Sequence, residues 1–158
     1  MKKVIYTALL MATAGILSAA GPDGFIGTWK NDPGTPTMTR DLALDGKVIV
    51  MTEHLPGRNG GPETVMIRKY PTDGSTATMD KGFWAGATAT GKMEGNVLTV
   101  DTTQANGTIW HDVWTLSEDG SRYTDEMSST PPLGGAQGGQ GGRGGRGRGP
   151  NKFSYTKE

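Results

Sequence analysis

The chain has 158 residues, and its 16 Lys and Arg balance its 16 Asp and Glu, so the formal net charge is zero. This length allows one domain of ordinary size, and the balanced charge excludes the strongly basic surface typical of nucleic-acid-binding proteins. Gly accounts for 26 residues, Pro for 9 and Cys for none, which disfavours a long-helix bundle and excludes disulfides, a thiol nucleophile and a Cys-ligated metal.

Residues 1–20 have the pattern of a bacterial signal peptide. Lys2 and Lys3 precede an apolar run from Val4 to Leu17, and small residues follow from Ser18. A basic start, an apolar run and small residues in this order are typical of an export signal. The alternative is an N-terminal membrane anchor, for which the apolar run is short. We expect a mature domain over residues 21–158, exported to the periplasm or the cell exterior.

Short β-type runs, separated by turn signals about every 8–12 residues, follow along the mature chain. Tight turns such as Asp45-Gly46 make consecutive strands antiparallel neighbours. About ten such strands cannot remain a flat sheet with two bare edges, so we predict an all-β, antiparallel up-and-down meander closed as a barrel, with a sandwich as the alternative. The predicted strands cover 25–30, 38–44, 47–55, 63–70, 75–79, 83–92, 97–103, 108–116, 121–129 and 152–157.

Residues 134–149 interrupt this pattern with ten Gly and three Arg in sixteen positions. A segment of this composition cannot bury enough apolar surface to offset its ordering entropy, so we predict a disordered insertion before the last strand. Export argues against the RNA binding that Gly/Arg repeats otherwise suggest. The three cations of this segment are Arg143, Arg146 and Arg148. They favour a weak contact with the anionic cell envelope, and the alternative is a solvated loop with no partner.

The first predicted strand contains Gly27-Thr28-Trp29, which resembles the Gly-x-Trp element of the lipocalin and fatty-acid-binding-protein superfamily. The segment 114–120, followed by Ser-Arg-Tyr-Thr, resembles the late hairpin of small exported bacterial lipocalin-like proteins of the calycin superfamily. The resemblance implies a lipocalin-like barrel in which Gly27 and Trp29 close one end and a late cation stacks on Trp29. Of the candidates Lys152, Lys157 and Arg122, the sequence favours Arg122.

The chain also departs from this superfamily. Residues 31–37 are too short and too rich in Pro and Gly for the helix–turn–helix lid of fatty-acid-binding proteins. The residues after Trp29 lack the glycines of haem-binding lipocalin-like barrels. Neither fatty-acid transport nor haem binding is therefore implied, and no cofactor is predicted.

The three remaining tryptophans suggest a wall for a ligand. Trp110 and Trp114 share one face of the strand over 108–116, and Trp84 lies among small residues. If that face points inward, Trp84, Trp110 and Trp114 line a pocket for an apolar or amphipathic ligand, and ordinary core positions are the alternative.

No pattern in the sequence indicates catalysis. His54 and His111 are the only histidines and fall on separate strands, so no metal site is predicted. The motifs GxSxG and HExxH and a phosphate loop do not occur in the chain, so no catalytic residue is assigned. The sequence favours an exported barrel that binds a small apolar or amphipathic ligand. The alternative is a packed structural protein that contacts the cell envelope or another protein through its loops.

Overall fold

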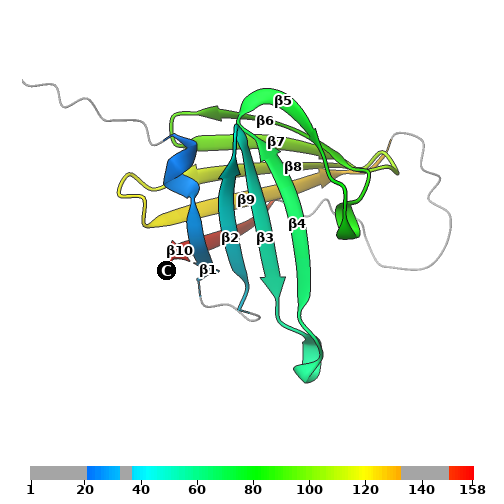
Figure 1. Cartoon of the computed structure of the whole chain (residues 1–158), viewed down its shortest axis with the longest axis horizontal. Helices are drawn as coiled ribbons and strands as arrows, with labels where there is room; N and C mark the ends of the chain where they lie inside the picture. The colour runs from blue at the N-terminus through cyan, green and yellow to red at the C-terminus, as the bar shows by residue number, and fades with distance from the viewer. Residues whose placement is uncertain (1–20, 33–36, 133–149) are drawn as a thin grey trace, which may run out of the picture.

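The computed structural model describes residues 21–32, 37–132 and 150–158, which form ten strands and three short 3-10 helices (Figure 1). The strands are β1 (Gly27–Asn31), β2 (Thr39–Asp45), β3 (Val48–Leu55), β4 (Thr64–Pro71), β5 (Asp73–Thr78), β6 (Thr88–Glu94), β7 (Val97–Thr103), β8 (Ile109–Leu116), β9 (Arg122–Thr130) and β10 (Asn151–Lys157). The helices are η1 (Pro22–Phe25), η2 (Arg58–Gly60) and η3 (Gly82–Trp84). None of them is long and apolar enough to cross a membrane. The predicted signal peptide (1–20) and Gly/Arg-rich insertion (134–149) lie outside the described residues.

The strands form one antiparallel sheet in the order β4-β3-β2-β1-β10-β9-β8-β7-β6-β5. Every strand pairs with its neighbour in sequence except at the β4–β5 junction, and β1 pairs with β10 so that Trp29 lies opposite Lys157. This confirms the predicted all-β meander of ten strands, curled into a nearly closed barrel. The predicted strand over 83–92 is shorter in the structure, because Gly82 and Gly86, at φ 71° and 81°, turn the chain through η3 before β6 begins.

The barrel closes between β4 and β5, the two edges of the sheet, through the junction between them. The backbone N–H of Thr72 donates a hydrogen bond to the carbonyl oxygen of Lys47 at 2.9 Å, and the carbonyl oxygen of Thr72 accepts one from the backbone N–H of Met93 at 2.9 Å. The end of β4 also packs directly on β6, since a Cβ added at Gly91 would lie 2.3 Å from the carbonyl oxygen of Pro71. Glycine is therefore required where the barrel wall closes.

The two ends of the barrel differ in how the strands connect. Tight turns join β2 to β3, β6 to β7 and β8 to β9 at one end, where η1 also lies, and we name this the closed end. Longer connections, η2 and η3 lie at the other end, which we name the open end. Figure 1 shows η1 in blue and the green turn of η3 on opposite sides of the molecule.

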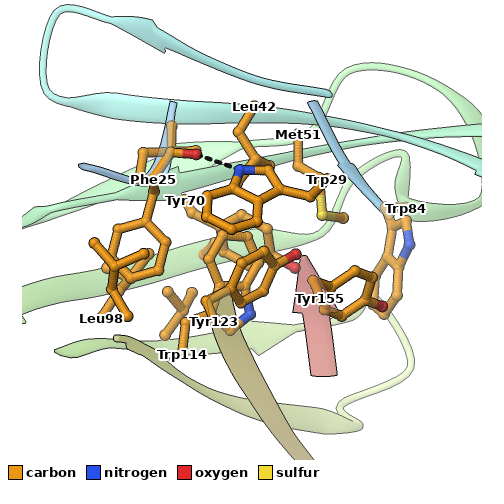
Figure 2. Close-up of a cluster of buried hydrophobic side chains, with 14 of the residues drawn as sticks. Phe25, Trp29, Leu42, Met51, Tyr70, Trp84, Leu98, Trp114, Tyr123 and Tyr155 are labelled. Atoms are coloured by element: carbon orange, nitrogen blue, oxygen red, sulfur yellow. Dashed lines mark hydrogen bonds between the residues drawn. The ribbon is translucent and has the colours of Figure 1, made fainter. Parts of the chain in front are cut away.

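Side chains fill the interior in successive layers, because inward positions recur every second residue along each strand. On β8, Leu116, Trp114, Asp112 and Trp110 follow one another from the closed end to the open end. Phe25 from η1 is fully buried at the closed end, and its ring lies 6.0 Å from that of Trp114 (Figure 2). The next layer toward the open end is aromatic and consists of Trp29, Tyr70, Trp114 and Tyr123.

Candidate functional site

A layer of buried charged side chains lies between the aromatic layer and the open end. Strand alternation places each member one inward position beyond an aromatic or apolar residue, as with Asp112 beyond Trp114. None of these residues is more than 4% exposed. The members, which we call the charged layer, come from five different strands and are Arg40 (β2), Glu53 (β3), Arg68 (β4), Asp112 (β8) and Asp125 (β9).

Arg40 connects two carboxylates of the charged layer. Its Nε donates to Glu53 Oε1 and its Nη1 donates to Asp125 Oδ2, both at 2.7 Å. The guanidinium also lies over the ring of Tyr155, with 4.2 Å between Cζ and the ring centroid. Burial opposes the charge on Arg40, but the nearby phenols and carboxylates outweigh it and raise its pKa well above the usual value. The hydrogen-bonded partners thus keep this buried guanidinium charged.

Arg68 is held more loosely than Arg40. Its Nη2 lies 3.5 Å from Glu53 Oε2, and its Nε has no hydrogen-bond partner among the described residues. The guanidinium lies over two rings, at 5.6 Å from the centroid of Tyr70 and 5.2 Å from that of Trp84. Because Trp84 belongs to η3, this contact links the charged layer to the open end.

Asp112 is the least satisfied member of the charged layer. It is 1% exposed, and neither carboxylate oxygen has a hydrogen-bond partner among the described residues. Burial raises its pKa to about 6, against the attraction of Arg68 and with the added repulsion of Asp125. An ionised carboxylate without a donor is costly in a protein interior, so this position is better suited to binding than to stability.

Unpartnered polar atoms are concentrated around this layer. Nine buried side-chain nitrogen and oxygen atoms lack a hydrogen-bond partner within the described ranges. Native interiors pair the great majority of such atoms, so their accumulation in one region indicates a site for water or a ligand. They include donors and acceptors and belong to Arg68, Tyr70, Trp84, Thr102, Asp112, Trp114, Asp125 and Tyr155. Within the same ranges, no group of three or more His, Cys, Asp or Glu is arranged to hold a metal ion.

Apolar side chains surround the approach to the charged layer from the open end. Trp84 and Trp110 meet edge to face with 5.8 Å between ring centroids, and the Trp110 indole N–H donates to Gln104 Oε1 at 3.2 Å. A hollow of about 310 Å³ lies beside them, between η3 and the β7–β8 turn, with Phe83 and Gln104 among its lining residues. The half-buried residues at inward positions near this end are Met66, Trp110, Met127 and Phe153.

The structure brings the three tryptophans of the sequence prediction to the inside of the barrel. Trp114 is fully buried and its ring centroid lies 4.7 Å from that of Tyr70, whereas Trp84 and Trp110 lie toward the open end (Figure 2 labels Trp84 and Trp114). The face shared by Trp110 and Trp114 therefore points inward. Their part in ligand binding stays a prediction.

The residues expected at the closed end are placed beside η1, with one change of partner. Trp29 is fully buried, and its Nε1 donates to the carbonyl oxygen of Phe25 at 2.7 Å (Figure 2). Lys157, rather than Arg122, lies over Trp29, with Nζ 5.2 Å from the ring centroid. Lys157 takes this place because the register of β1 against β10 sets it opposite Trp29. The side chain of Arg122 is instead 63% exposed, and its Nη2 lies 3.7 Å from Oδ1 of Asp32. Gly27, at φ 134°, leaves room for the Lys157 side chain, because a Cβ added at Gly27 would lie only 3.0 Å from Cε of Lys157.

Sequence reasoning missed the charged layer entirely. A signal was present in the alternation, because Asp112 shares a strand face with Trp110 and Trp114, and Arg40 shares one with Leu42. A charge on an otherwise apolar face marks either a solvent-facing position or an interior polar site. Only the closure of the barrel decides between the two.

Comparisons with known proteins define the class of fold. No protein-family model and no curated protein sequence matches the chain. A secretory abundant heat soluble protein from Ramazzottius varieornatus is similar in structure at 10% identity and TM-score 0.57, covering 85% of this chain and 96% of that chain. The fluorescent protein UnaG is similar at 15% identity and TM-score 0.52, covering 86% and 98%. Zebrafish ileal bile acid-binding protein complexed with cholic acid is similar at 15% identity and TM-score 0.51, covering 85% and 98%.

These neighbours are calycin-like β-barrel proteins, and the chain shares their antiparallel β-barrel fold. At 10–15% identity the likeness concerns the fold, while the function has to be argued from the site.

Proposed function

We propose that the protein binds a small amphipathic molecule inside the barrel. The polar group of the ligand contacts the charged layer, and its apolar part lies toward the open end against the rings of Trp84 and Trp110. The observation that carries this proposal is the set of nine buried, unpartnered nitrogen and oxygen atoms around one layer of the interior. Each such atom costs about 1–3 kcal/mol when it lacks a partner, so a ligand that supplies partners gains affinity from them.

Two further observations support an amphipathic ligand rather than a purely polar one. The half-buried aromatic and Met side chains near the open end offer an apolar surface above the charged layer. The zebrafish neighbour is described as a bile acid-binding protein in complex with cholic acid, an amphipathic molecule, so this type of barrel accommodates such ligands.

We also propose that the protein acts after export. The support for this is the basic, apolar and small-residue pattern of residues 1–20, which is typical of a signal peptide. Fusing residues 1–20 to mature alkaline phosphatase in a bacterial host tests it. Enzyme activity in the periplasm is expected, and activity that requires the enzyme's own signal would contradict it.

Ligand binding is tested with the neutral fluorescent probe N-phenyl-1-naphthylamine, titrated into the protein lacking residues 1–20. We expect a saturable rise in probe fluorescence and at least a fivefold weaker apparent Kd for Trp110→Ala. The matched control is Ile109→Ala, because Ile109 directly precedes Trp110 on β8, faces outward and is 40% exposed. A probe fluorescence that does not saturate would contradict the proposal and favour a packed interaction protein. Equal weakening of probe binding by the two variants would do the same.

A further inference from the structure

We propose that the ligand is a cationic amphiphile whose ammonium group binds between Asp112 and Asp125. This inference rests on the proposed function and adds the chemical class of the ligand. It separates this barrel from one built to hold a carboxylic acid.

The charge balance of the interior is the first argument. The described residues place two arginines and three carboxylates in the charged layer, which gives a charge of −1 when all five are ionised. A bound monocation brings this layer to zero, whereas a bound carboxylate brings it to −2. Uncompensated charge in a protein interior is strongly unfavourable, so the layer favours a cation over an anion.

The second argument is which groups remain free. Both oxygens of Glu53 are engaged, Oε1 by Arg40 and Oε2 by Arg68. Three carboxylate oxygens have no hydrogen-bond partner among the described residues, namely both of Asp112 and Oδ1 of Asp125. An ammonium group carries three N–H donors, which matches these three acceptors. Of the charged donors that a carboxylate ligand needs, those of Arg40 are engaged by Glu53 and Asp125, which leaves Nε of Arg68 as the buried charged donor without a partner among the described residues.

The placement of the two carboxylates is the third argument. Asp112 on β8 lies opposite Met127 on β9, and Asp125 is the next inward residue on β9. This makes the two aspartates diagonal neighbours on the inner face of adjacent strands, within reach of one small group. The ring of Trp114 lies on the same face beside them, and Trp rings attract cations.

The raised pKa of Asp112, caused mainly by burial, is consistent with this assignment. A bound ammonium would replace part of the solvation that the carboxylate loses in the interior. We therefore expect ligand binding to favour the ionised form of Asp112.

The test compares three twelve-carbon ligands (dodecylammonium, dodecanoate and dodecan-1-ol, here the dodecyl ligands), each competing with N-phenyl-1-naphthylamine at pH 7.5 below its micelle-forming concentration. We expect dodecylammonium to bind at least tenfold more tightly than dodecanoate. Asp112→Asn should weaken the binding of dodecylammonium at least tenfold and change the affinity for dodecan-1-ol by no more than about twofold. The matched control is Glu126→Gln, which removes a carboxylate from the outward face of β9, where Glu126 pairs with Lys152 at 2.6 Å.

The outcomes separate the two proposals. If neither the probe nor any dodecyl ligand binds saturably, the proposed function fails. If the probe binds but dodecanoate competes better than dodecylammonium, or if Asp112→Asn leaves their ratio unchanged, the cationic assignment is overturned and the binding function stands.

A pH series on the unmodified chain provides a second measurement in case Asp112→Asn does not fold. Dodecylammonium affinity should fall at least fivefold from pH 8 to pH 5 as Asp112 takes up a proton, while dodecan-1-ol affinity changes little. The same series on His111→Gln shows whether the neighbouring imidazole causes the change. An affinity for dodecylammonium that is independent of pH would overturn the assignment. The charged and titratable groups around Asp112 are Arg40, Glu53, Arg68, Tyr70, His111 and Asp125.

Discussion

Nη1 of Arg40 lies 2.7 Å from Oδ2 of Asp125, and this buried ion pair joins β2 to β9 inside the barrel. The two strands are separated in the sheet by β1 and β10, so the pair connects parts of the wall that have no ladder in common. Both side chains are at most 3% exposed, and Arg40 also holds Glu53. Arg40 thus supplies a charged hydrogen bond to each of two buried carboxylates, and Glu53 has a second cation in Arg68.

Removing Arg40 should destabilise the protein strongly. Arg40→Ala leaves the buried carboxylate of Asp125 without its cation and leaves Glu53 with only the longer contact to Arg68, and we expect the free energy of unfolding to fall by about 3–5 kcal/mol. Urea denaturation at pH 7.5 measures this change. Lys47→Ala is the control, because the Lys47–Asp73 ion pair is exposed and should contribute little. Equal effects of the two substitutions would show that the Arg40 pairs do not hold the barrel together.

Asp112 should make the protein less stable at neutral pH than in mild acid. Its folded pKa of about 6 lies above the ordinary value of 3.8, so the native state binds more protons than the unfolded chain between these values. The contribution of Asp112 to stability therefore decreases as pH rises from about 4 to 6 and stays low above that range.

Asp112→Asn should remove this penalty. We expect the variant to gain about 1–3 kcal/mol in free energy of unfolding at pH 7.5 relative to the unmodified protein, and to gain little at pH 4. Urea denaturation at the two pH values provides the comparison. A gain of the same size at both would mean that it does not come from the ionised carboxylate.

The close approach of β4 to β6 makes Gly91 sensitive to any side chain. A Cβ at this position would lie 2.3 Å from Pro71 O and 2.9 Å from Val100 Cγ2, so Gly91→Ala forces the wall apart where the barrel closes. We expect a loss of about 1–3 kcal/mol in the free energy of unfolding. Gly21→Ala is the control, since nothing lies within 4 Å of its added Cβ and its φ is −65°. A tolerated Gly91→Ala would show that the β4–β6 contact is looser than described.

Trp29 should stabilise the closed end through its hydrogen bond as well as its ring. Trp29→Phe keeps an aromatic ring against Tyr123 but leaves the buried carbonyl of Phe25 without its donor, which should cost about 1–3 kcal/mol. Thermal unfolding followed by circular dichroism checks this.

Lys157→Ala should lower stability more than Arg122→Ala, because Lys157 is the cation over the ring of Trp29. The reverse order would contradict the observed stacking.

The turns and alternation of the sequence predict most of the architecture. Asp45-Gly46 predicts the β2–β3 hairpin, which the structure forms one residue later: Asp45 still pairs with Val48, and Gly46, at φ 61°, is the first of the two loop residues. The stacking partner of Trp29 was not predictable, because it depends on the register of β1 against β10, strands from opposite ends of the domain. Similarly, Arg40 alternates with apolar residues on β2, and only closure of the barrel shows that this face points inward.

The most direct test of the account follows the four tryptophan indole N–H signals by ¹⁵N–¹H correlation NMR during titration with N-phenyl-1-naphthylamine. The signals are assigned with single Trp→Phe variants. Because the ligand is expected between the open end and the charged layer, the signals of Trp84, Trp110 and Trp114 should shift in a saturable way. The signal of Trp29, whose N–H is bonded to Phe25 at the closed end, should change little. Saturable binding that leaves the first three signals unmoved would place the ligand outside the barrel and contradict the account.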